Sequence, residues 1–204
     1  MDIEYRSLKR LEVRQIDDSE ALRVELSGYA STFGSPYEVD GMIETIERSA
    51  FDRTLREKPD VFAFIGHDPS RPIARTTNGS LVLSADEHGL RALIMPIDTQ
   101  EGRDAVTLVS TGTLDAMSFG FIVKDDTIEL RDGKLHRQIT DLDLHEVSIV
   151  AFPANPAARI STRSKEVGHR LLQAAEAETR RSRRRVILPP NPLSSYIGGS
   201  NGAE

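Results

Sequence analysis

Three residues far apart in the sequence, Ser118, His67 and Glu146, have the side chains that nucleophilic acyl transfer requires. Ser118 lies in "DAMSFGF", a segment with the composition of a β-strand, and Gly120 shares its face of that strand. A glycine inside a strand commonly marks a bulge or a close approach by another group, so this face leaves space beside the hydroxyl. A serine that is simply hydrogen-bonded within a sheet would account for the same pattern.

His67 follows the apolar run "VFAFIG" and precedes "DPSRPI", so we expect it at the end of a strand. A neutral imidazole could accept the proton of a serine hydroxyl there, because its ordinary pKa is about 6.5. A turn residue without a chemical role is the alternative. The adjacent Asp68 is poorly placed to orient the ring if the strand continues, since successive side chains point to opposite faces.

Glu146 belongs to "LDLHEVSIV", where alternation places it in a mostly apolar row with Leu144 and Ser148, while His145 lies on the other face. A carboxylate in such a row needs a cation or strong hydrogen-bond donors, because an unpaired buried charge is costly. A histidine or an arginine would serve equally. The residue types therefore leave two interpretations open, an orienting contact to a catalytic histidine and a structural ion pair.

Other kinds of site find little support in the sequence. There is no cysteine, and the five histidines lack a short ligand spacing, so we expect no metal site and no cofactor. There is no Gly-rich phosphate loop, and "MSFGF" is not the G-x-S-x-G elbow of the α/β-hydrolases.

Composition narrows the class of protein further. The 204 residues carry a net charge of −6 with 5% aromatic residues, which disfavours a specific nucleic-acid binder. Residues 164–204 hold seven Lys and Arg against four Asp and Glu, a net charge of +3 that leaves −9 on the rest. The N-terminus lacks the continuous apolar stretch of a signal peptide, and no run is long enough to span a membrane. We expect a soluble cytoplasmic protein.

The elements that must position these side chains follow from periodicity. Alternating or continuous apolar runs predict strands at residues 22–28, 61–66, 81–86, 90–97, 117–123 and 142–152. Capping patterns predict two short helices, one starting at Ser49 and ending before Pro59, the other starting after Asp98 and continuing to residue 112. Asp132-Gly133 predicts a two-residue hairpin of type I′, which needs positive φ at both positions.

This order of elements predicts an α+β domain over residues 1–163, with a β-barrel-like or strongly curled mixed sheet and flanking helices. Beyond it, residues 164–204 change to a polar, helix-like basic stretch and then to a Pro-, Gly- and Ser-rich end. We expect that end to be disordered, because it cannot bury enough apolar surface.

Four segments together resemble the prohead (procapsid) maturation protease family of tailed bacteriophages. They are "GYASTFGSPYEVDGMIETIERSAFDRTL", "FIGHDPSRPIA", "DTQEGRDAVTLVSTGTLDAMSFGFIV" and "LHEVSIVAFPANPAA". The resemblance covers roughly residues 20–160 in the family's order. It implies a fold similar to that of the herpesvirus assembly proteases and the active site of a serine endopeptidase.

Carried over residue by residue, the resemblance makes Ser118 the nucleophile and His67 its general base. The third residue of the catalytic triad is a second histidine in the herpesvirus enzymes, but the matching position here is Glu146. We choose Glu146 because its row suits a buried orienting group, with His145 as the fallback.

The resemblance also implies an oxyanion site and partners. The herpesvirus enzymes use a pair of arginines after the last strand, whereas "PANPAAR" has no such pair, which leaves a backbone N–H near Asn155 or the side chain of Arg159 as candidates. The implied substrates are scaffold or the scaffold-like segment of the major capsid protein, and the enzyme itself. The implied setting is the assembling procapsid in the host cytoplasm, with a self-associating protease and no membrane.

Two other classes of function remain as alternatives. One is a non-enzymatic capsid assembly or scaffolding factor with the same fold, because the tail has a scaffold-like composition. The other is a small adaptor that binds nucleic acid through "RRSRRR", although such a run is usually a solvated helix end.

Overall fold

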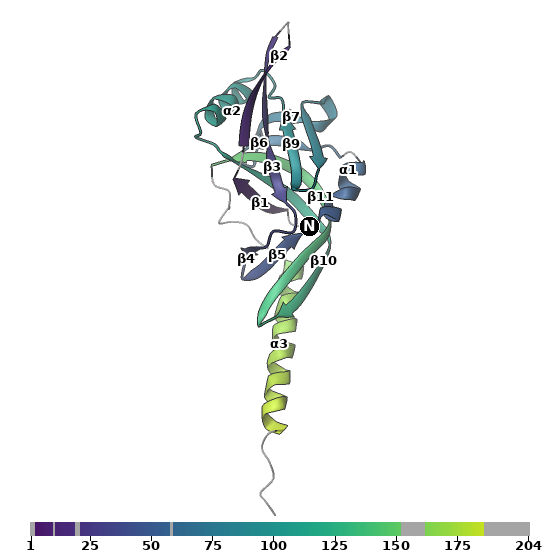
Figure 1. The fold of residues 1–204 in the computed structure, drawn as a ribbon. Helices are drawn as coiled ribbons and strands as arrows, with labels where there is room; N and C mark the ends of the chain where they lie inside the picture. The colour runs from purple at the N-terminus through teal and green to yellow at the C-terminus, as the bar shows by residue number, and fades with distance from the viewer. Residues whose placement is uncertain (1–2, 10, 19–20, 58, 152–161, 186–204) are drawn as a thin grey trace, which may run out of the picture.

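The computed structural model describes residues 3–9, 11–18, 21–57, 59–151 and 162–185, and these form two β-sheets with flanking helices (Figure 1). The α+β class predicted from the sequence is confirmed. In the described part of the chain the strands are divided between the two sheets and do not close into one barrel.

The larger sheet contains β1 (Glu4–Lys9), β4 (Tyr37–Val39), β5 (Met42–Ile46), β6 (Phe62–Ile65), β7 (Asp68–Arg75), β10 (Ala116–Arg131) and β11 (Lys134–Val150). The smaller sheet contains β2 (Leu11–Asp18), β3 (Ala21–Thr32), β8 (Leu81–Ala85) and β9 (Gly89–Ile94). The helices are α1 (Asp52–Glu57), α2 (Gln100–Ser110) and α3 (Thr162–Arg185), with 3₁₀ turns at Arg48–Phe51 and Thr76–Asn78.

The long strands β10 and β11 organise the larger sheet, whose main path runs β1-β10-β11-β5-β4. β10 and β11 are antiparallel, while β5 and β6 pair in parallel with different halves of β11. Asp132 and Gly133 join the two long strands with φ angles of 51° and 76°, so the type I′ hairpin predicted from the sequence is confirmed. The register that starts at this turn shifts by one residue between Gly120 and Phe121, and that shift places Gly120 opposite Glu146 and Ser118 opposite Ser148.

Both helical segments start at a different N-cap residue from the one that the sequence predicted. Asp98 pairs with Arg103, and the N-cap of α2 is instead Thr99, whose hydroxyl accepts a hydrogen bond from the Gly102 N–H. The other helical segment begins as a 3₁₀ turn at Arg48, with Glu47 at the cap position. In both cases the N-cap is a nearby residue with an extended backbone. The spacing of capping residues in the sequence does not show which of two neighbouring residues will be the N-cap.

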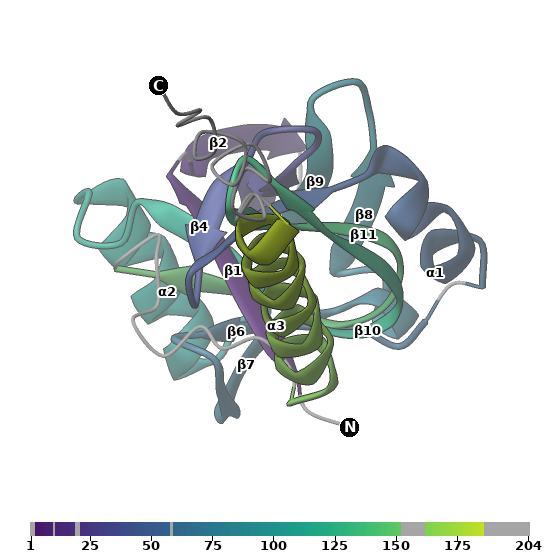
Figure 2. The ribbon, with the colours of Figure 1, turned by 90° about the horizontal axis from the view of Figure 1, so that it is seen from below.

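The main core draws its apolar side chains from both sheets and from α2. A second, smaller cluster of Val39, Met42 and Leu135 is covered by Leu171 of α3. Figures 1 and 2 show α3 lying beside the β10–β11 hairpin and extending away from the body of the protein. None of the described helices is long and apolar enough to cross a membrane.

A buried ion network fixes β1 to the sheet. Arg6 contacts Glu44 of β5 at 2.6 Å, and the fully buried Arg137 of β11 contacts Glu4 at 2.7 Å and Glu44 at 2.8 Å. Burial alone would raise the pKa of Glu44, yet Arg6 and Arg137 together hold that pKa below its usual value. The network therefore links three strands on the face of β1 that carries Glu4 and Arg6.

Candidate active site

Ser118 lies near the start of β10 and is completely buried. Its Oγ donates a hydrogen bond of 2.7 Å to the carbonyl oxygen of Arg6, in the adjacent strand β1. In this state the hydroxyl is bonded within the sheet, to the strand β1 that pairs with β10. Both β10 and its neighbour β11 are buried here, so the serine stands in a dry part of the molecule.

His67 sits in the tight turn between β6 and β7. Gly66 and His67 both have a left-handed backbone, with φ angles of 67° and 63°, and the Gly66 N–H donates to the carbonyl oxygen of Ile149. A positive φ is unfavourable for a histidine and persists only where the surroundings enforce it. The turn follows the end of β6 that pairs with Ile149 of β11, and from there the His67 ring reaches back to Glu146, on the face of the sheet that carries Ser118.

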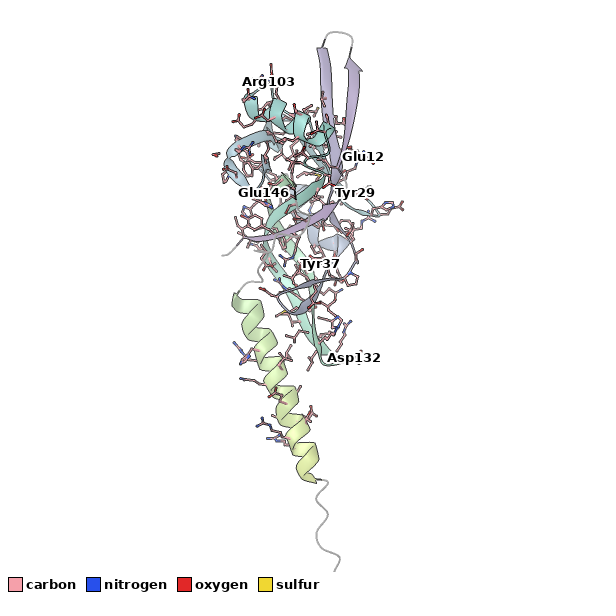
Figure 3. The ribbon with its side chains drawn as sticks, turned by 90° about the vertical axis from the view of Figure 1, so that its left-hand side faces the viewer. Glu12, Tyr29, Tyr37, Arg103, Asp132 and Glu146 are labelled. Carbon is pink, nitrogen blue, oxygen red and sulfur yellow. The ribbon has the colours of Figure 1, made fainter. Side chains whose placement is uncertain are left out.

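Glu146 contacts the side chain of His67. Its Oε1 lies 2.7 Å from Nδ1 of His67, and 8% of its side chain is exposed. His145 is exposed and lies at the shift in register between β10 and β11. Figure 3 places Glu146 within the body, far from Asp132 at the tip of the same hairpin. The partner of this carboxylate is thus a histidine rather than an arginine.

The contact also determines which ring nitrogen can act as a base. A carboxylate accepts the proton of Nδ1–H, which leaves Nε2 of a neutral imidazole free to accept another. Nε2 of His67 is buried and has no hydrogen-bond partner among the described residues.

The absence of a side chain at Gly120 leaves room for the groups that surround the imidazole of His67. A Cβ built on Gly120 would lie 2.7 Å from Oε1 of Glu146 and 2.9 Å from Cε1 of Tyr5, so a side chain there would displace both groups. Tyr5 meets the imidazole of His67 edge to face, with ring centroids 4.5 Å apart. Burial, and then the charge of Glu146, raises the pKa of Tyr5, which keeps its hydroxyl neutral. The expected open space beside Ser118 is therefore taken up by this packing.

Register places Ser118 beside the histidine–carboxylate pair. Ser118 and Gly120 are two positions apart on one face of β10, a separation of about 7 Å along the strand. Since Tyr5 and Glu146 flank Gly120 and contact His67, the ring lies over the position next to Ser118. The structure thus gathers the three predicted side chains on one face, although Ser118 and His67 are not hydrogen-bonded to each other.

Ser148 is a member of this cluster that the sequence analysis did not single out. It is completely buried, its Oγ donates to Oε2 of Glu146, and the backbone N–H of His67 donates to the same Oγ at 3.2 Å. The sequence feature that could have identified Ser148 is its position two residues after Glu146, on the same inward row of the strand. The candidate oxyanion residues Asn155 and Arg159 lie outside the described residues.

Comparison with known proteins identifies the class. The model of the caudovirus prohead serine protease family matches residues 9–172, so the chain belongs to that family and is a serine peptidase of capsid maturation. No curated protein matches the sequence.

A solved structure shares the fold. The capsid assembly protease gp21 of bacteriophage T4 superposes with a TM-score of 0.52 at 8% sequence identity, over 74% of this chain and 98% of that one. The resemblance inferred from the four sequence segments is confirmed. The family match begins at residue 9, so most of β1, with the carbonyl that holds Ser118, lies before it.

Proposed function

We propose that Ser118 is the nucleophile of this peptidase, His67 its general base and Glu146 the carboxylate that orients His67. The contact of 2.7 Å between Nδ1 of His67 and Oε1 of Glu146, made on the same sheet face as Ser118, carries the proposal. The burial of Glu146 supports its role, because a carboxylate in a dry site stabilises the imidazolium that forms during the reaction.

The reaction then follows from the two ring nitrogens. His67 Nε2 takes the proton of the Ser118 hydroxyl as Oγ attacks the peptide carbonyl, and Glu146 holds the resulting imidazolium through Nδ1. The imidazolium protonates the leaving amine, and a water molecule activated by His67 releases the acyl group from Ser118. A backbone N–H near Asn155 or the Arg159 side chain would stabilise the oxyanion.

The reaction requires a rearrangement from the state described above. Ser118 Oγ is bonded to the carbonyl of Arg6 and is fully buried, so a peptide reaches it only after β1 leaves this position. A turn about the Cα–Cβ bond of Ser118 would then aim its hydroxyl at His67, since serine has three staggered rotamers.

The proposed substrates are scaffold or a scaffold-like segment of the major capsid protein, inside the assembling procapsid. Family membership supports this proposal, as does the name of the T4 relative, a capsid assembly protease. We extend it to the enzyme's own tail beyond residue 163 and to self-association of the protease within the shell.

The test is co-expression of the full chain with the major capsid protein and scaffold of its phage, followed by intact-mass analysis. We expect truncated capsid or scaffold species with wild type, and full-length species with Ser118→Ala. Ser27→Ala, which removes a buried hydroxyl in the other sheet, is the matched control and should cleave normally. Cleavage that persists in Ser118→Ala would overturn the assignment of the nucleophile.

A further inference from the structure

We infer that Ser148 is a positioning residue of the active site, one that aligns Glu146 and His67 with each other. This inference rests on the proposed roles of Ser118, His67 and Glu146. The Ser148 hydroxyl uses its proton and a lone pair on two different members of the group, the Glu146 carboxylate and the His67 backbone.

The first contact restrains the carboxylate. Glu146 has two oxygens, of which Oε1 faces Nδ1 of His67, while Oε2 accepts the hydrogen bond from Ser148. Without that second bond the carboxylate could rotate about its terminal torsion, which is a soft one. Ser148 therefore fixes which oxygen the imidazole meets and in which plane.

The second contact restrains the histidine. His67 has a φ of 63°, a conformation that a non-glycine residue keeps only under constraint. Its N–H donates to Ser148 Oγ, next to the Gly66 N–H that donates to Ile149, so consecutive N–H groups of the turn are both held by β11. The side chain of Ser148 thus ties the turn that carries the base to the strand that carries the carboxylate.

The position of Ser148 in the sheet distinguishes it from the other serine that lies beside Ser118. Ser148 is completely buried and lies directly opposite Ser118 in the β10–β11 register. On the other side of Ser118, also in register, is Ser7 of β1, whose buried Oγ has no hydrogen-bond partner among the described residues. Two serines flank Ser118 in one row of the sheet, and only Ser148 contacts the histidine–carboxylate pair.

That row supplies a matched control. Ser148→Ala and Ser7→Ala each remove one buried hydroxyl beside Ser118, but only the first breaks contacts to Glu146 and His67. We expect Ser148→Ala to lower kcat about 10- to 100-fold with little change in KM, because a hydrogen bond to a charged group is lost where orientation matters. Ser7→Ala should stay within a factor of about 3 of wild type, and Ser148→Thr, which keeps a hydroxyl, should exceed Ser148→Ala in kcat.

A second measurement does not depend on turnover. The proton between His67 Nδ1 and Glu146 gives a far-downfield proton NMR signal, identified by its loss in Glu146→Gln. We expect Ser148→Ala to shift or broaden this signal and Ser7→Ala to leave it unchanged, with a cooperative thermal transition retained in both.

The outcomes separate the two proposals. A wild-type signal in folded Ser148→Ala, or a kcat within a factor of about 3 of wild type, would overturn the inference about Ser148. If wild type cleaves no capsid or scaffold substrate, the proposed function fails, while the NMR comparison still decides whether Ser148 aligns the pair.

Discussion

At the scale of single residues, the contact between His67 and Glu146 defines the site. We expect Glu146→Gln to lower kcat/KM about 10³-fold, because an amide neither stabilises the imidazolium nor enforces the Nδ1–H tautomer, a loss of about 4 kcal/mol of transition-state stabilisation. Steady-state hydrolysis of a capsid-derived peptide measures the effect. His145→Gln is the adjacent control and should remain near wild type, since the side chain of His145 is exposed. The opposite order of effects would refute the choice of Glu146.

Gly120 allows a test of packing rather than chemistry. Gly120→Ala would place a Cβ 2.7 Å from Glu146 Oε1 and 2.9 Å from the ring of Tyr5. We expect a loss of about 1–3 kcal/mol in the free energy of unfolding and a large loss of kcat, because overpacking displaces the groups that hold His67. Urea denaturation and peptide hydrolysis report the two effects. An active Gly120→Ala enzyme would mean that His67 does not depend on this packing.

At the scale of elements, the proposed reaction requires β1 to move away from Ser118. The natural chain has no cysteine, so the double variant Lys9→Cys/Ala116→Cys would place one cysteine on each strand at a register pair of β1 and β10. Directly opposed residues of an antiparallel pair lie close enough for a disulfide. We expect the oxidised protein to be folded but inactive, since the disulfide keeps β1 paired with β10 beside Ser118, and we expect reduction to restore activity.

Each single cysteine variant serves as a control for that experiment and should not respond to oxidant or reductant. An oxidised double variant that hydrolyses peptides as fast as its reduced form would show that substrate reaches Ser118 with β1 in place.

The ion network behind β1 makes a prediction about stability. Glu44→Gln leaves Arg6 and Arg137 with less compensating charge in a buried site, so we expect a loss of about 3 kcal/mol in the free energy of unfolding. The exposed Glu12→Gln is the control and should be nearly neutral. Chemical denaturation at neutral pH measures the difference, and equal stabilities of the two variants would contradict it.

The same network gives stability a pH dependence. The pKa of Glu44 is lowered in the folded state, so its contribution is present above the ordinary value of 4.5 and is lost as pH falls through the folded-state pKa. Denaturation curves taken at a series of pH values below 4.5 should show stability falling for wild type. The fall should be less steep for Glu44→Gln, and curves of equal slope would exclude Glu44 as a source.

At the scale of the whole molecule, we propose that residues 1–163 are the protease domain and residues 164–204 a tail. Leu171 of α3 covers the small cluster of Val39, Met42 and Leu135, so the tail is not wholly separate from the body. We expect a chain ending at Arg163 to unfold cooperatively, with about 1–2 kcal/mol less stability from the lost apolar contact, and to cleave an accessible peptide. A chain ending at Arg185 separates the effect of α3 from that of residues 186–204.

The tail has a second expected role. Its net positive charge suits docking on an acidic partner in the assembling shell, so the chain ending at Arg163 should be packaged poorly into procapsids although it remains active. Quantitative analysis of purified procapsids measures this. Loss of the cooperative transition in the truncated chain would show instead that the tail completes the fold.

Much of this protein was determined by its sequence alone. Alternation along residues 142–152 predicted Glu146 on the inward row, and Glu146 is buried while His145 is exposed; Asp132-Gly133 predicted the turn that joins β10 to β11. These features are local: a period of two residues, or a turn that needs positive φ, is encoded in neighbouring residues. For the same reason the strands predicted at residues 22–28, 61–66, 81–86 and 90–97 overlap β3, β6, β8 and β9.

Only the tertiary structure decided what each side chain meets. Strands β1, β2, β4, β5 and β7 were not predicted, because they are short or rich in charged residues whose burial depends on distant partners, as Arg6 depends on Glu44. The contact of Glu146 with His67, the hydrogen bond from Ser118 to β1 and the double contact of Ser148 likewise join segments far apart in the chain. A residue's own neighbours carry its periodicity but not the identity of the strand that packs beside it, so these contacts appear only when the sheet is assembled.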